Sequence, residues 1–238
     1  QARLSDQTCP EMKHKLKFLT IKAVPNLFWS SPKPFTIRPP LISTFVLIIG
    51  LVLFGIGEAL LIASGVGVSP WTVFAQGITQ VTGWSIGFAT FVISLFVLLL
   101  WIPLRQTPGL GTVLNMIIIA VVLDYALPYM PVFDHLALRI TEAISGVIIT
   151  GFGGGVYLIA KLGPGPRDGL MTGLQSLTNF PIAWERSAIE LTVVVIGFFL
   201  GGVVGIGTPL FAFGPCVVGA LYGLQWVFAE KNSRQKSV

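Results

Sequence analysis

A nearly continuous apolar stretch from Leu41 to Ala229, broken mainly by Gly and Pro clusters, constrains this chain more than any other feature. Only 11% of the 238 residues are charged, whereas an ordinary soluble domain has about a quarter. About half of the charges lie outside this stretch. The composition excludes a soluble enzyme, a nucleic-acid-binding module and a disordered chain. It predicts an all-α protein, a polytopic transmembrane helical bundle in a lipid bilayer.

The charges and cysteines predict the domain organisation and the location. Residues 1–40 are basic and contain several prolines, and we expect a cytoplasmic tail there, followed by a transmembrane domain over 41–229 and a short cytoplasmic tail over 230–238. The net charge of +5 indicates membrane orientation, and the basic tails favour both termini in the cytoplasm. Cys9 and Cys216 lie in different contexts, so we expect no disulfide, metal or cofactor. No nucleic-acid partner is expected, and a homo-oligomer or a membrane protein partner stays open.

Hydropathy predicts two kinds of helix. A membrane-spanning helix needs about 20 mostly apolar residues, and Trp71, Trp84 and Trp101 near expected helix ends fit an interfacial belt. Two segments, 69–83 and 166–179, are too short or too polar to span comfortably. Six segments are long enough: Leu41–Ser64, Trp84–Leu104, Gly111–Tyr129, Thr141–Ala160, Ile182–Gly202 and Thr208–Ala229.

The chain aligns with itself at an offset of 96 residues, which predicts two internal repeats over about 41–129 and 138–229. The matches gather at residues that shape turns. The expected structural turns are Gly67, Pro70, Gly109 and Gly111, matched by Gly163, Pro166, Gly205 and Gly207.

The orientation of the two repeats depends on the short helices. If the short helices are re-entrant, each repeat crosses three times and the repeats are inverted. If they span, each repeat crosses four times and the repeats are parallel. Three crossings place Arg105 and Lys161 with the basic tails and leave the acidic linker around Asp134 on the other side. The rule that positive residues face the cytoplasm therefore favours the inverted arrangement.

Both short segments carry a polar stripe behind a Gly/Pro break. Polar groups in lipid must face protein or a water-filled cavity. Broken helices in matching positions of two halves indicate a transporter binding site, although the stripes can also serve to pack the halves together. The candidate substrate-binding residues are Thr72, Gln76, Thr79, Asp168, Thr172 and Gln175.

Charged residues within the apolar stretch are candidates for a gate or a coupling site. Glu190 lies four residues after Arg186, a spacing that allows an ion pair along one helix face. Arg167 stands beside Asp168, and Glu58 lies in the middle of the first expected helix without an acid at its equivalent position, Gly154. We expect Arg167, Arg186, Glu190 and Glu58 to form the gate or coupling group, with packing roles as the alternative.

Several ordered motifs resemble the YczE-like bacterial membrane proteins, with a looser similarity to the YitT membrane domain. The resemblance covers about residues 41–229 and implies a multi-pass protein of the bacterial inner membrane, of the permease type and without a known substrate. This chain has Thr72 after Trp71, where that family typically has Asp, and Asp168 is the matching acid in the second repeat. The motifs are Gly67-Val68-Ser69-Pro70-Trp71, Trp101-Ile102-Pro103-Leu104-Arg105-Gln106, Pro108-Gly109-Leu110-Gly111-Thr112, Gly163-Pro164-Gly165-Pro166-Arg167-Asp168-Gly169-Leu170, and Glu190-Leu191-Thr192 followed by Gly205-Ile206-Gly207-Thr208.

The expected function is that of a secondary-type permease for a small polar or anionic solute, with its site between two inverted repeats. One alternative is a membrane partner or anchor that does not transport. A second is an intramembrane enzyme, but His14 and His135 lie far from the candidate acids in the sequence. We therefore expect no catalytic residues.

Overall fold

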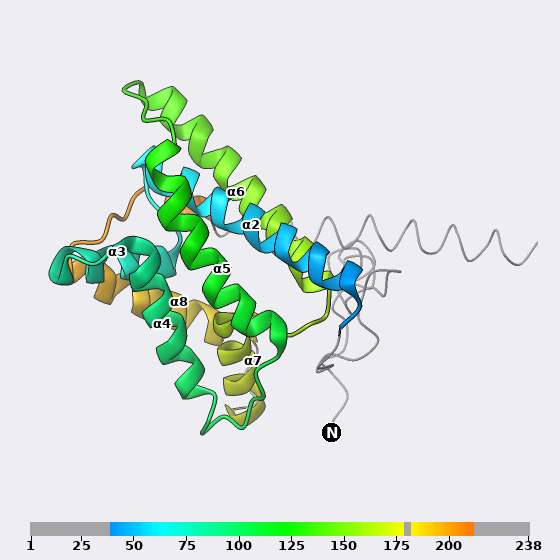
Figure 1. The fold of residues 1–238 in the computed structure, drawn as a ribbon. Coiled ribbons are helices and arrows are strands. Elements are labelled where there is room, and N and C mark those ends of the chain that lie inside the picture. The colour runs from blue at the N-terminus through cyan, green and yellow to red at the C-terminus, as the bar shows by residue number, and fades with distance from the viewer. Residues whose placement is uncertain (1–38, 179–181, 212–238) are drawn as a thin grey trace, which may run out of the picture.

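The computed structural model describes residues 39–178 and 182–211, and every regular element there is a helix (Figure 1). Both tails and most of the sixth expected span lie outside the described residues. The elements are α2 (Leu41–Ser64), α3 (Pro70–Thr82), α4 (Ile86–Leu100), α5 (Leu110–Ala126), η1 (Leu127–Tyr129), α6 (Leu136–Ile159), α7 (Pro166–Thr178), α8 (Ile182–Phe199) and α9 (Gly207–Phe211).

Local sequence signals set the ends of the helices around α3. Pro70 is the first residue of α3, where its missing N–H leaves no hydrogen bond unmade. Gly65 after α2 and Gly83 after α3 both adopt the left-handed conformation that favours glycine. Ser85 begins α4 by accepting a hydrogen bond from the backbone N–H of Phe88. Helix α3 therefore forms where the sequence predicts a short helix, and so does α7, which begins at Pro166.

By length and apolar composition, three helical segments in the described part of the chain can cross a bilayer: Leu41–Ser64, Leu110–Tyr129 and Leu136–Ile159. Helices α3 and α4 bend by 114° at their junction and would add a fourth if they form one span. Helix α4 has 15 residues. Helix α8 has 18 residues and contains Glu185, Arg186 and Glu190. The second and fifth expected spans are thus shorter or more polar than the three segments that can cross.

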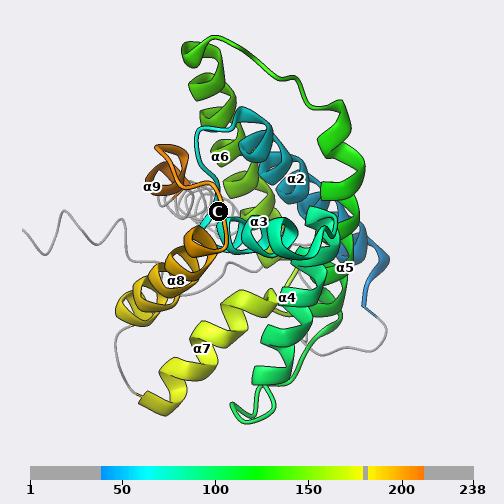
Figure 2. The ribbon, with the colours of Figure 1, turned by 90° about the vertical axis from the view of Figure 1, so that its left-hand side faces the viewer.

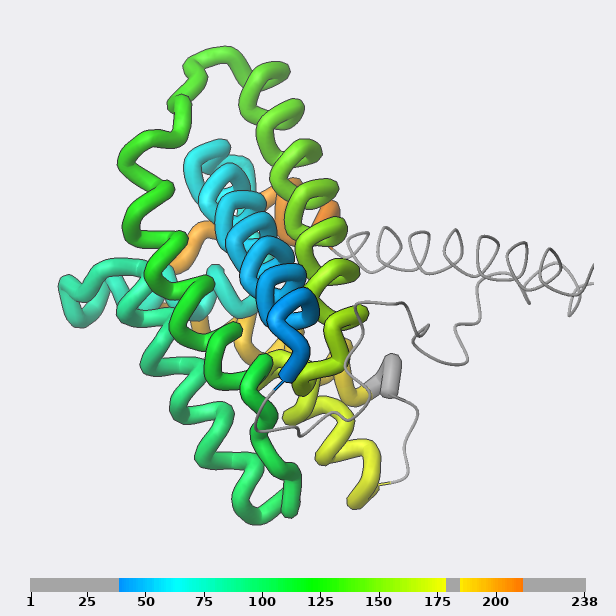
Figure 3. The backbone as a smooth tube through the Cα atoms, turned by 45° about the vertical axis from the view of Figure 1, so that its right-hand side comes forward, coloured from blue at the N-terminus to red at the C-terminus, as the bar shows by residue number. Residues whose placement is uncertain are grey.

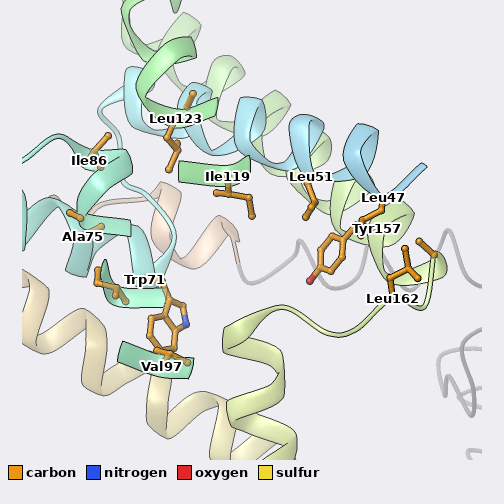
Figure 4. Close-up of a cluster of buried hydrophobic side chains, with 14 residues drawn as sticks. Leu47, Leu51, Trp71, Ala75, Ile86, Val97, Ile119, Leu123, Tyr157 and Leu162 are labelled. Atoms are coloured by element: carbon orange, nitrogen blue, oxygen red, sulfur yellow. The ribbon is translucent and has the colours of Figure 1, made fainter. Parts of the chain in front are cut away.

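The helices form two layers. Helix α2 packs between α5 and α6 (Figure 3), and these three make the first layer. Helix α3 packs on α8, and α4 on α7, in the second layer (Figure 2). A core of buried apolar side chains joins the layers, with Leu47 and Leu51 from α2, Trp71 from α3 and Ile119 from α5 (Figure 4).

Helices α2 and α6 run antiparallel and cross through glycines. A Cβ atom on Gly50 would lie 2.7 Å from the backbone N of Tyr157, and one on Gly146 would lie 2.8 Å from the carbonyl O of Gly57. A Cβ on Gly153 would lie 2.6 Å from the carbonyl O of Gly50. Gly50 of α2 therefore lies against Gly153 of α6, and Gly57 lies against Gly146, so the two helices run in opposite directions. Small residues at these positions let the two backbones approach closely, as is typical of helix pairs in membranes.

Two turns between helices make the same backbone contact at an offset of 96 residues. The backbone N–H of Gly111 donates to the carbonyl of Leu162 at 2.8 Å, and that of Gly207 donates to the carbonyl of Val66 at 3.0 Å. Gly111 and Gly207 stand 96 positions apart, and so do Val66 and Leu162, so the two hydrogen bonds join matching positions. Gly67 and Gly163, also 96 residues apart, have φ values of 125° and 121°. The two turns therefore have matching backbone geometry at this offset.

Candidate functional site

A cavity of about 110 Å³ lies where the two layers meet. At about 30 Å³ for each water molecule, it has room for three to four waters or one small solute. Each of the α-helices α2 to α9 contributes at least one residue to the cavity wall, and the short 3-10 helix η1 contributes none. The lining residues are Phe54, Trp71, Thr90, Ser94, Asn115, Met116, Ile119, Tyr157, Gly165, Pro166, Arg167, Asp168, Met171, Arg186, Glu190 and Phe211.

Four pairs of lining residues stand 96 positions apart, the offset at which the sequence aligns with itself. The earlier residue of each pair is uncharged, and the later residue is charged in three of the four pairs. At these positions, the charge in the cavity wall therefore comes from the later part of the chain. The pairs are Trp71 with Arg167, Thr90 with Arg186, Ser94 with Glu190, and Asn115 with Phe211.

Arg167, in the first turn of α7, is one of two described arginines that line the cavity, the other being Arg186. Its guanidinium carbon lies 5.3 Å from the centre of the Trp71 ring, within range of a cation–π interaction. The guanidinium also interacts electrostatically with Glu58, Asp168 and Glu190. Among the described residues it makes no hydrogen bond or ion pair. Within the described part of the chain, its N–H donors therefore have no hydrogen-bond acceptor, and the residue lines the cavity.

Asp168 follows Arg167 and faces the cavity with two other polar groups. The Tyr157 hydroxyl donates a hydrogen bond to Asp168 Oδ2 at 2.6 Å. A Cβ atom on Gly165 would lie 3.2 Å from Asp168 Oδ2 and 3.3 Å from both Asn115 Nδ2 and the Tyr157 hydroxyl. A glycine at position 165 thus leaves space around which the three groups converge. Figure 4 shows the Tyr157 ring projecting from α6 across the core.

Arg186 and Glu190 form the ion pair that their spacing predicts. Arg186 Nε lies 2.8 Å from Glu190 Oε1 on one face of α8, and both residues line the cavity. Their side chains are 40% and 24% exposed. Such a pair is only partly desolvated, so a solute can compete for it at low cost.

Glu58 lies behind the cavity wall and is 2% exposed. Its Oε2 accepts hydrogen bonds from the Thr72 hydroxyl at 2.6 Å and the Ser69 hydroxyl at 3.0 Å. Its Oε1 is buried and has no hydrogen-bond partner within the ranges 39–178 and 182–211. Thr72, a candidate substrate ligand, thus binds Glu58 and does not line the cavity.

The other candidates from the polar stripes also lie away from the cavity wall. Gln76 Oε1 accepts a hydrogen bond from the backbone of Val203 at 3.0 Å. The Thr79 hydroxyl donates to the Ala75 carbonyl within its own helix. Thr172 is exposed and donates to the Gly169 carbonyl. Gln175 is half-buried. Of the six stripe candidates, Asp168 is the one that lines the cavity.

The structure adds lining residues that the stripes did not indicate and corrects the expectation for two tryptophans. Trp71 is 6% exposed and lies under Arg167. Trp101 is 2% exposed and donates from Nε1 to the Pro166 carbonyl at 2.9 Å. Both are therefore buried packing residues, so the interfacial belt was wrong for them. Thr90 and Ser94 were not predicted to line a site, although the 96-residue offset matches them to Arg186 and Glu190.

Apolar helices around a small charged cavity define the class of this molecule as a helical membrane protein. The chain belongs to a family of unknown function, DUF6198, whose model matches residues 41–222. The predicted resemblance to YczE-like proteins is thereby confirmed.

Three relatives agree with this membership. An uncharacterized protein of Haemophilus influenzae is 41% identical over 192 residues, which cover 81% of this chain and 87% of that protein. The uncharacterized membrane protein YczE of Bacillus subtilis is 34% identical over 165 residues, covering 68% and 77%. The uncharacterized protein YyaS of the same species is 25% identical over 193 residues, covering 79% and 94%. No solved structure matches the chain.

Proposed function

We propose that the protein is a multi-pass permease of the bacterial inner membrane that carries a small polar or anionic solute through the cavity between its two halves. The observation that supports this most is the Arg167 guanidinium, which faces the cavity and has no ion-pair partner among the described residues. Cations of this kind within a membrane domain mark substrate and ion pathways. A guanidinium also matches the planar oxygens of a carboxylate.

The path of the first half supports three crossings. The end of α2 lies beside the start of α6, because Arg139 Nε donates to the Ser64 carbonyl at 2.7 Å. The start of α4 lies at the end of α5, where Ser85 and Gly87 bond to the Asp124 carboxylate at 2.7 Å and 2.8 Å. Because a short linker joins the end of α5 to α6, α3 begins and ends at one end of the bundle. Helix α3 is then re-entrant.

The antiparallel pairing of α2 and α6 supports inverted halves. These helices occupy equivalent positions in the two repeats, so opposite directions in the bilayer mean opposite topologies of the halves. A cavity at the interface of two inverted repeats, next to two broken helices, has the arrangement of many secondary transporters. Rocking of one half against the other would expose such a cavity to each side of the membrane in turn.

Uptake into proteoliposomes tests this function. The solutes are labelled lactate, pyruvate, phosphate and glycine, and the matched variants are Ser94→Phe, which fills the cavity from α4, and Ser94→Ala, which leaves it open. We expect at least one of these solutes to enter several-fold faster with the wild type and Ser94→Ala than with Ser94→Phe. Equal uptake with all three proteins, or no uptake of any of the four solutes above that of empty liposomes, contradicts the permease.

A further inference from the structure

Among the described residues around Arg167, the acids outnumber the cations that can balance them. Arg186 pairs with Glu190, which leaves Glu58 and Asp168 to share Arg167. Two carboxylates opposite one guanidinium carry a net charge of −1 in a partly desolvated environment. Burying an uncompensated charge is costly, and a bound proton removes that cost.

Glu58 differs from Asp168 in its surroundings. Asp168 receives a hydrogen bond from Tyr157 and borders the cavity. Glu58 is almost fully buried, and its Oε1 has no partner and can take a proton without breaking a bond. Among the described residues, the charged group that faces Glu58 is Arg167 on α7, while α3 offers the Ser69 and Thr72 hydroxyls.

Glu58 and a bound anion would compete for the same guanidinium. When Glu58 is ionised, Arg167 faces two carboxylates of the protein itself, Glu58 and Asp168. When Glu58 Oε1 carries a proton, Asp168 is the carboxylate of this pair that stays ionised, so an anion that pairs with Arg167 in the cavity meets one negative charge fewer. Binding of the anion and binding of the proton therefore favour each other, as linkage requires.

We infer that Glu58 is a proton-binding site coupled through Arg167 to the cavity, so that one proton enters with each small monocarboxylate. The inference rests on the proposed function and names its substrate class and driving ion. The balance is simple: a proton joins Glu58 Oε1, a monoanion joins Arg167, and no net charge is added. Ser69 and Thr72 set the proton affinity, because their hydroxyls stabilise the ionised form of Glu58.

Binding of pyruvate to the purified protein in lipid nanodiscs tests this coupling, since pyruvate stays ionised between about pH 5.5 and pH 8. Calorimetry in buffers of different ionisation enthalpy counts the protons taken up. For the wild type we expect one proton per pyruvate above the midpoint, with affinity falling about tenfold per pH unit there. Glu58→Gln, which mimics the protonated acid, is expected to bind with little dependence on pH and without proton uptake.

Two further variants keep the test decisive. Glu142→Gln removes another buried glutamate, which interacts with Arg139 and does not line the cavity, so it should behave as the wild type. Thr72→Val removes one donor to Glu58 and should move the midpoint to higher pH, a readout that serves even if Glu58→Gln does not fold.

The contradicting outcomes separate the two proposals. Wild-type binding without proton uptake, or an unchanged pH dependence in both Glu58→Gln and Thr72→Val, overturns the role of Glu58 and leaves the permease intact. Loss of proton uptake in Asp168→Asn alone moves the proton to Asp168 and also overturns it. If neither pyruvate nor lactate binds while phosphate or glycine is taken up, the substrate class is wrong. If no solute binds or enters, the permease fails as well.

Discussion

Replacing Arg167 by Gln is expected to weaken anion binding by about 30-fold or more, equivalent to about 2 kcal/mol, which is the lower range for losing one partner of a desolvated charge pair. The reason is that Arg167 is the cavity cation without an ion pair among the described residues, whereas Arg186 is held by Glu190. Calorimetric titration of the wild type and the variant with pyruvate measures the change. Arg167→Lys keeps the charge but loses the planar fork of donors, so its affinity for pyruvate should lie between those of the wild type and Arg167→Gln.

Arg105→Gln is the matched control for that loss. Arg105 is exposed in the turn after α4 and does not line the cavity. Its replacement removes one positive charge from the protein, as Arg167→Gln does, and should leave pyruvate affinity unchanged. Equal losses in the two variants would mean that the anion responds to overall charge. Unchanged affinity in Arg167→Gln would remove Arg167 from the site.

The second large effect is expected at the crossing of α2 and α6. Gly153→Val should lower the free energy of unfolding by about 3 kcal/mol, the upper range for overpacking. Its Cβ would lie 2.5 Å from the backbone N of Phe54 and 2.6 Å from the carbonyl O of Gly50. Backbone atoms cannot move aside as side chains can, so the two helices would have to separate. Replacing Gly by a residue of higher helix propensity offsets at most about 1 kcal/mol of this loss in the free energy of unfolding.

Unfolding in mixed detergent micelles measures this change, with Ala137→Val as the control. Ala137 is exposed on α6, so the same β-branched side chain meets no packed backbone there. Gly50→Val, on the facing helix, should be as damaging as Gly153→Val. If Gly153→Val were as stable as Ala137→Val, the close approach of α2 and α6 would be wrong.

Local signals made the helices predictable from the sequence. The two short helices begin at Pro70 and Pro166, as the Gly/Pro breaks predict, and α2 has the bounds that hydropathy gives it. The Arg186–Glu190 pair followed from spacing along one helix. Each of these features depends on residues close together in the chain, where turn chemistry and helix periodicity apply.

The cavity wall was harder to predict because it depends on which helices meet. Thr72 and Gln76 share a helix face, but one turns to Glu58 and the other to the turn before α9. Asn115 and Tyr157 come from α5 and α6 and reach the cavity only through packing. Periodicity shows that residues share a face, and it does not show what that face contacts.

The most direct test of two oppositely oriented halves is the side of the membrane on which the linker between α5 and α6 lies. A cysteine in place of Asp134, with Cys9 and Cys216 changed to Ser, can be labelled with an impermeant maleimide in intact cells and in inverted vesicles. We predict labelling in intact cells, because three crossings carry the chain from a cytoplasmic start of α2 to the outside. Labelling confined to inverted vesicles would mean parallel halves, and would contradict the inverted arrangement on which the permease rests.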